Sequence, residues 1–257
     1  MSKRRLTVPL ISLVLGLAPL LLSGCFLGEH AMAARDRFQE TVPFQPGDTF
    51  RLENVNGEVL IETWDRAEVS IEAEKAASSE RFLKQIEIEV DRSGYEVEVR
   101  TRLPRRRSFF GRMGKVDYRI RVPDEARVEV ETVNGRVLVE GIRGRVKAST
   151  VNGGIEIQGA AGQVEVSTVN GSIKARYLDV DQGGRNRFST TNGSVRIELP
   201  PDVSGEFEAR TIHGSIETDF PLEVTGKIGR RLRGRLGEGR GSFEISTVNG
   251  SVRIEKL

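Results

Sequence analysis

The chain is poor in the residues that most often carry chemistry. It has one cysteine, two histidines and one tryptophan in 257 residues, and aromatic residues make up only 6% of it. A single cysteine excludes an intramolecular disulfide and a metal cluster built from several thiolates. Few aromatic residues together with 28 glycines favour many short strands and turns over one large globular core.

The chain also lacks a strong excess of charge of either sign. Its 39 cationic and 37 acidic residues give a formal net charge of +2, which falls to −1 when residues 1–24 are removed. Nucleic-acid-binding domains are usually strongly basic, so we expect no nucleic-acid partner.

The N-terminal residues predict secretion. Lys3, Arg4 and Arg5 precede an almost wholly apolar run from Leu6 to Leu22, which is the order found in a signal peptide. The run also reaches the ~17-residue minimum for a membrane span, so an uncleaved anchor is the alternative. The following "LLSGC" resembles the lipobox of bacterial lipoproteins. The resemblance implies cleavage after residue 24 and attachment to a membrane through a lipidated Cys25.

Residues 25–40 show no strand pattern and are predicted to be a short helix or a flexible tether. At ~3.3 Å per residue such a segment spans at most about 50 Å, which keeps the folded part near its membrane. Phe26 stands where retention in the inner membrane usually requires Asp. In a host with two membranes we therefore expect sorting to the outer membrane.

Residues 41–127 are predicted to form a β-rich N-terminal part. Alternation of apolar and polar residues begins near Thr49 and returns in several short runs. "SSERFLKQ" at 78–85 breaks the alternation and predicts one short helix with a serine cap. "DRSG" at 91–94 predicts a hairpin turn.

Residues 128–257 are built from a repeated T-x-N-G motif, with a weaker early copy at "NVNG" and an insert at 222–241. A catalytic motif is needed once, whereas a structural corner is needed once per turn of the chain. Steps of 18 residues separate Asn134, Asn152 and Asn170, and later steps are longer. The predicted corner residues are Asn56, Asn134, Asn152, Asn170, Asn192, His213 and Asn249.

Two all-β folds fit this pattern. In an antiparallel β-hairpin meander each Asn-Gly is a tight turn, and in a short β-solenoid each Asn-Gly is a corner. Both folds place the corner residues at positive φ, which Asn and Gly tolerate. We favour the solenoid because stacked corners also explain the recurring Thr and Asn, whose side chains form hydrogen-bonded ladders.

The recurring "TVNG", the early "VNGEVLIETWD" and the final "GRGSFEISTVNGSVRI" resemble the bacterial putative-adhesin family of β-strand-repeat proteins. The resemblance covers about residues 40–257. It implies a short β-solenoid at the cell envelope and supplies no catalytic residues. His213 departs from the asparagine pattern.

The chemical motifs of enzymes are missing from the sequence. It contains no Ser-His-Asp arrangement, no histidine pair with metal-ligand spacing and no phosphate-binding glycine motif, so we expect no enzyme activity, metal or cofactor. His30 and His213 are interpreted as tether and corner residues. A polysaccharide-cleaving solenoid that uses outward carboxylates is the enzymatic alternative.

One segment suggests a binding surface. "RLPRRRSFFGRMGK" combines cations with apolar residues and includes Arg105, Arg106, Arg107, Phe109 and Phe110. Such a composition suits anionic lipid or an acidic glycan, although it also fits a solvated loop. The expected function is a structural, adhesive or binding role at the bacterial envelope, towards glycans, anionic lipid or another envelope protein. Envelope-stress sensing is a further alternative.

Overall fold

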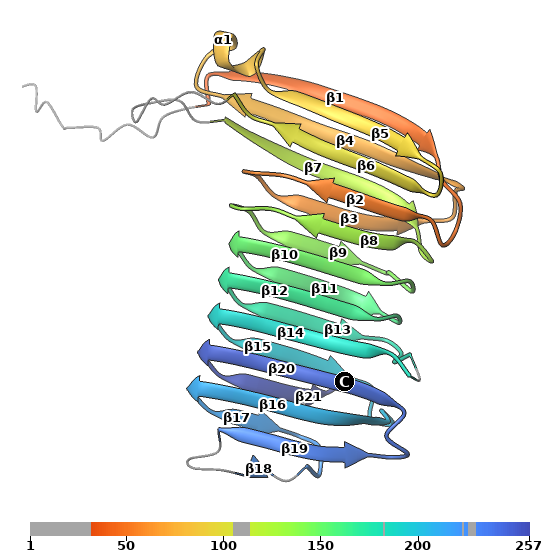
Figure 1. Cartoon of the computed structure of the whole chain (residues 1–257), viewed down its shortest axis with the longest axis vertical. Helices are drawn as coiled ribbons and strands as arrows, with labels where there is room; N and C mark the ends of the chain where they lie inside the picture. The colour runs from red at the N-terminus through yellow and green to blue at the C-terminus, as the bar shows by residue number, and fades with distance from the viewer. Residues whose placement is uncertain (1–31, 105–113, 182, 223, 226–229) are drawn as a thin grey trace, which may run out of the picture.

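The computed structural model describes residues 32–104, 114–181, 183–222, 224–225 and 230–257. Two long β-sheets face each other along the whole stack (Figure 1). Sheet A contains, in spatial order, β1 (Ala34–Pro43), β4 (Glu68–Ala77), β7 (Gly114–Pro123), β3 (Val59–Trp64), β9 (Val137–Glu140), β11 (Ile155–Ala160), β13 (Ile173–Tyr177), β15 (Val195–Leu199), β21 (Val252–Lys256) and β17 (Ile216–Thr218). Sheet B contains β18 (Val224–Thr225), β19 (Arg231–Leu236), β16 (Gly205–His213), β20 (Gly241–Asn249), β14 (Arg185–Asn192), β12 (Val164–Asn170), β10 (Val146–Asn152), β8 (Arg127–Glu131), β2 (Thr49–Glu53), β6 (Glu96–Arg102) and β5 (Glu87–Ser93).

Each repeat forms one coil, which is a strand of sheet B, a corner and a strand of sheet A. Neighbouring coils pair in parallel and in register, so that Val146 lies opposite Val164 and Asn152 opposite Asn170. The same pairing joins β11 to β13 in sheet A. Parallel strands cannot be joined by two-residue hairpins, so the repeats form a solenoid and the meander alternative is excluded.

The core lies between the sheets and is made by every second residue of each strand. Val146, Ala148, Ile155 and Ile157 are each no more than 1% exposed, and their neighbours in sequence point outwards. The following coils repeat the pattern with similar side chains. Small and β-branched residues fit because stacked sheets lie only ~10 Å apart.

The spatial order of the coils differs from their order in the chain at both ends. The last coil, β20–β21, lies between the coils β14–β15 and β16–β17. The first coil, β2–β3, lies between β8–β9 and β6–β7. Figure 1 accordingly places the C-terminus within the stack.

Two predicted boundaries are wrong. Residues 34–40, assigned to the tether, belong to β1, which pairs antiparallel with β4 along ten residues. β1 is an edge strand with mostly exposed side chains, so it lacks the apolar alternation that reveals other strands. The insert at 222–241, for which the sequence predicts no strand, contains β18 and β19, and β19 pairs antiparallel with β16.

The local predictions in the N-terminal part agree with the structure. The helix α1 (Glu80–Leu83) begins after Ser79, whose hydroxyl accepts a hydrogen bond from the Phe82 amide. β5 and β6 form the expected hairpin, with Gly94 at a φ of +60° in the turn. No helix in the described ranges is long and apolar enough to cross a membrane.

Candidate functional site

Several predicted site residues lie outside the described residues. These are the lipidation residue Cys25 and the cationic, aromatic group Arg105, Arg106, Arg107, Phe109 and Phe110. Their roles stay predictions. The insert at 222–241 also carries cationic side chains, some of which belong to the described residues. Arg233 and Arg235 on β19 form ion pairs with Glu208 and Glu206, at 2.9 and 2.8 Å.

The corner asparagines form one continuous ladder along the stack. Each Nδ2 donates to the Oδ1 of the next asparagine, over distances of 2.7–2.9 Å. The order is Asn249, Asn192, Asn170, Asn152, Asn134 and Asn56, and Asn56 donates to the Gly114 carbonyl. His213 lies beyond Asn249 and contributes its carbonyl to the Gly250 amide.

The reason for Asn-Gly differs from the prediction at most corners. Asn152 is the last residue of strand β10, and Gly135, Gly153 and Gly171 are not among the glycines with positive φ, whereas Gly57 has a φ of +125° and Gly193 a φ of +158°. The glycines are required by close stacking. A Cβ on Gly153 would lie 2.0 Å from the Gly135 carbonyl oxygen, and one on Gly171 would lie 1.9 Å from that of Gly153.

The corner threonines form a second ladder inside the asparagine row. Thr168 Oγ1 donates to the Gly153 carbonyl at 2.9 Å, and Thr150, Thr190, Thr211 and Thr247 repeat the contact. Among the described residues, Thr132 Oγ1 and Asn54 Oδ1 are buried without a hydrogen-bond partner. Asn54 stands in place of the motif threonine in the weak first copy, and Thr132 belongs to the next coil, so the regular ladder begins at Thr150.

The four central corners form an uncharged surface, which we call the corner face. It comprises residues 149–155, 167–173, 189–195 and 246–252, and none of them is charged although 30% of the chain is. These four coils are neighbours in the stack. Val151 and Val169 on this face are 40% and 41% exposed and lie beside the asparagine ladder.

Outside the corner face, outward side chains are mostly charged and paired between coils. Arg145 binds Glu165 at 3.0 Å, and Arg187 binds Glu244 at 2.9 Å. Burial alone raises the pKa of Glu156, but hydrogen bonds from Arg136 and Gln158 lower it overall. Exposed pairs of this kind contribute little to stability, so they chiefly keep the sheet faces soluble.

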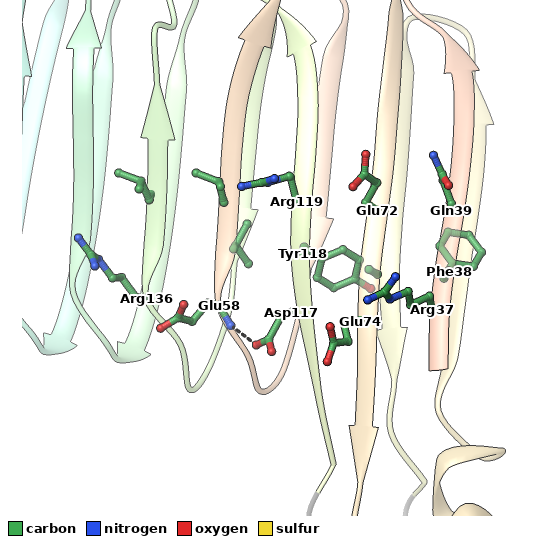
Figure 2. A pocket seen from close by; sticks show the side chains of 14 residues that line it. Arg37, Phe38, Gln39, Glu58, Glu72, Glu74, Asp117, Tyr118, Arg119 and Arg136 are labelled. Atoms are coloured by element: carbon green, nitrogen blue, oxygen red, sulfur yellow. Dashed lines mark hydrogen bonds between the residues drawn. The ribbon is translucent and has the colours of Figure 1, made fainter. Parts of the chain in front are cut away.

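A hollow with a volume of about 600 Å³ crosses sheet A over β1, β4, β7, β3 and β9 (Figure 2). Leu60 and Leu138 lie side by side in adjacent strands and supply its half-buried apolar contact. Its charged lining residues are Arg37, Glu58, Glu72, Glu74, Asp117, Arg119 and Arg136. This site cannot be recognised in the sequence, because it depends on the spatial order β1-β4-β7-β3-β9.

The hydroxyls of two buried tyrosines have hydrogen-bond partners in the core. The Tyr118 hydroxyl lies 2.7 Å from Thr101 Oγ1, and burial raises the pKa of Tyr118 to about 12. The Tyr177 hydroxyl donates to Asn186 Oδ1 at 2.8 Å, and burial raises the pKa of Tyr177 well above its usual value. Within the described residues, no group of three or more His, Cys, Asp or Glu side chains is arranged to hold a metal ion.

Parallel coils, interlocked corner glycines and the Asn and Thr ladders define a short β-solenoid. The chain belongs to the Toastrack DUF4097 family, whose model matches residues 42–255. This agrees with the putative-adhesin resemblance and its implied fold. The comparison with curated proteins gives no match.

Solved structures also match the chain at low sequence identity. A putative cell adhesion protein from Clostridium sporogenes is 13% identical with a TM-score of 0.52, and the match covers 86% of this chain and 100% of that one. A putative lipid binding protein from Parabacteroides distasonis is 14% identical with a TM-score of 0.33, over 86% and 97% of the two chains. A putative adhesin from Bacteroides fragilis is 8% identical with a TM-score of 0.32, over the same shares. At these identities the first similarity concerns the fold alone.

Proposed function

We propose that the protein is a lipid-anchored, non-catalytic binding protein of the bacterial envelope that holds an uncharged glycan on its corner face. The observation that supports this proposal most is the absence of charge from four neighbouring corners of a chain that is otherwise rich in charge. An uncharged surface imposes no desolvation cost on charges when an uncharged ligand covers it.

The composition of the corner face favours a saccharide. Val151 and Val169 are two exposed apolar side chains in adjacent coils, which we call the ridge. The Asn ladder and the exposed Ser172 and Ser194 provide hydrogen-bonding groups beside it. A sugar likewise presents apolar C–H groups and hydroxyls. Adjacent coils lie ~4.8 Å apart, so a ligand with a short linear repeat meets the same groups at each step.

The area of the corner face suits a glycan chain better than a protein partner. Four coils of ~4.8 Å and about four residues of ~3.3 Å give a surface of only about 250 Å². A stable protein interface usually covers about 800 Å² on each partner. A single glycan chain lying along the stack needs much less.

The location in the envelope rests on the N-terminal sequence. A lipid on Cys25 holds the solenoid close to a membrane, and sorting to the outer membrane is proposed for a host with two membranes. The segment with Arg105, Arg106, Arg107, Phe109 and Phe110 is proposed as an accessory contact for anionic lipid or an acidic glycan. The polysaccharide-cleaving and stress-sensing alternatives have no comparable support from the described residues.

The test measures binding of residues 32–257 to uncharged oligosaccharides, namely chito- and cello-oligosaccharides, with product analysis of the same mixtures. Val151→Lys combined with Val169→Lys places two charges on the ridge and is expected to weaken binding at least about tenfold. Leu178→Lys, at a 67% exposed leucine outside the corner face, is the matched control and keeps parental binding. No binding, binding unaffected by the ridge variant, or shortened oligosaccharides would contradict the proposal.

A further inference from the structure

Most charged side chains in the sheet A hollow form ion pairs with described residues, but two of them do not. Asp117 binds Lys115 at 2.6 Å, Glu72 binds Arg121 at 3.3 Å and Arg119 binds Glu62 at 3.5 Å. Glu74 pairs with Arg35, and Arg136 pairs with Glu156. Among the described residues, the guanidinium of Arg37 and the carboxylate of Glu58 take part in no ion pair or side-chain hydrogen bond.

These two unpaired charges lie at opposite sides of the hollow and in one row. Arg37 is opposite Glu74, Glu74 is opposite Asp117, and Asp117 accepts a hydrogen bond from the Glu58 amide. Three strand spacings therefore separate Arg37 on β1 from Glu58, the residue before β3, which is about 14 Å. Both side chains are exposed, and Figure 2 shows them on the two sides of Asp117 and Glu74.

The apolar contact lies next to Glu58. Leu60 is two residues further along β3 and points to the same side of the sheet, and Leu138 is its neighbour on β9. The hollow thus presents a free cation, a free anion about 14 Å away across the strands, and a leucine pair displaced from the anion along the strands.

We propose that the hollow binds an extended peptide segment of another envelope protein. In an extended chain, residues i and i+4 lie about 13 Å apart on one face, and residue i+6 follows on the same face. An acidic residue at i meets Arg37 and a basic residue at i+4 meets Glu58. The leucines are displaced along the strands from this row, so the peptide crosses the sheet obliquely and its apolar residue at i+6 packs on Leu60 and Leu138. This site is separate from the corner face and does not depend on the proposed glycan function.

The charge pattern favours a peptide over other envelope ligands. A neutral glycan can offer hydroxyl hydrogen bonds but no opposite charge to Arg37 or Glu58. Anionic lipid meets four carboxylates and three arginines in the lining, so the hollow as a whole does not attract it.

The experiment uses residues 32–257 and two blocked synthetic peptides in a Ser/Thr background. The first peptide carries Asp, Lys four residues later and Leu two residues after that, and the second has Asp and Lys exchanged. The parent is expected to prefer the first peptide by about tenfold, because exchange places like charges together at both ends. Arg37→Glu with Glu58→Arg is expected to reverse this preference.

The matched control is Arg185→Glu with Glu131→Arg on sheet B, where both side chains are exposed and form no ion pair within the described part of the chain. It is expected to keep the parental preference, and thermal melting checks that each variant is folded. Leu138→Asn is expected to weaken binding of the first peptide several-fold without changing the preference for the first peptide's order of Asp and Lys.

Absence of peptide binding, or binding indifferent to the exchange of Asp and Lys, would overturn the proposal. Binding to phosphatidylglycerol vesicles or chito-oligosaccharides that the Arg37 and Glu58 variant abolishes would overturn it too, because the hollow would then serve another ligand. If only the Val151 and Val169 variant weakens glycan binding, that result concerns the corner face. The peptide measurements alone then decide whether the hollow binds a peptide.

Discussion

At the scale of single residues, the corner glycines matter more for stability than the asparagines beside them. Gly171→Ala would place a Cβ 1.9 Å from a backbone carbonyl oxygen, so neighbouring coils must separate. We expect a loss of about 3 kcal/mol in the free energy of unfolding. Asn152→Val removes two exposed side-chain hydrogen bonds from a strand residue and is expected to cost only about 1 kcal/mol.

Urea denaturation of both variants measures this difference. Gly241→Ala is the control, because its added Cβ meets no atom closer than 3.5 Å and the glycine has no positive φ. If Gly171→Ala is as stable as Gly241→Ala, close stacking is not the reason for glycine at the corners.

Tyr118 predicts how stability changes at alkaline pH. Burial raises the pKa of Tyr118 to about 12 in the folded chain, against about 10 when unfolded. The stability associated with the neutral hydroxyl is complete below pH 10 and is lost as pH rises to 12. The full loss is on the order of 2 kcal/mol.

Tyr118→Phe should therefore flatten the fall in unfolding free energy between pH 10 and 12, although it also removes the contact with Thr101. Tyr95→Phe, at a tyrosine that is 83% exposed, is expected to keep the parental slope. An unchanged slope in Tyr118→Phe would show that this hydroxyl does not control the alkaline transition.

The sequence allowed the corner residues to be predicted, but not the physical reason for them. Repetition identified Asn152 and its counterparts, whereas their strand geometry depends on how closely adjacent coils approach. The uncharged corner segments are visible in the sequence itself, once the repeats are aligned. The hollow was not predictable, since Arg37, Glu58 and Leu138 come together only through the order of the strands.

At the scale of elements, the two terminal segments should contribute unequally to stability. β1 pairs with one strand, whereas β20 and β21 each pair on both sides. A chain beginning at residue 44 loses an edge strand and is expected to unfold cooperatively at lower urea. A chain ending at residue 240 loses an inner coil and should unfold with a clearly smaller m-value, because m follows the surface exposed on unfolding.

The parent for both comparisons is residues 32–257. A chain ending at residue 240 with the parental m-value would mean that β16 and β17 restack on β14 and β15, and that the inner position of the last coil is dispensable. A chain beginning at residue 44 is also expected to aggregate more readily, because the edge of β4 is then open.

Alternation predicted the inner strands well, because one face of each is buried between the sheets. It failed for β1, whose exposed residues carry no such alternation, and for β19, which was hidden in a glycine- and arginine-rich insert. The interleaved order of the end coils left no sign in the sequence, since β16 and β20 carry nearly the same motif.

At the scale of the whole molecule, the predicted membrane attachment depends on one side chain, Cys25, which lies outside the described residues. Cys25→Ala is expected to abolish labelling by radioactive palmitate and to leave the precursor unprocessed, because the thiol is the predicted lipid acceptor. Cys25→Ser, which keeps the size but not the thiol, should behave in the same way. A labelled mature band from either variant would show that Cys25 is not the attachment point.

The interleaved coils impose an order on the synthesis and folding of the chain. Residues 205–236 are synthesised before residues 241–256, yet they stack on them. Strands β16 and β17 therefore cannot reach their final position until residues 241–256 have been synthesised. Until then β14 and β15 each have one unpaired edge. The position of β20 and β21 thus makes closure of this part of the stack depend on residues that are made after the coil that covers them.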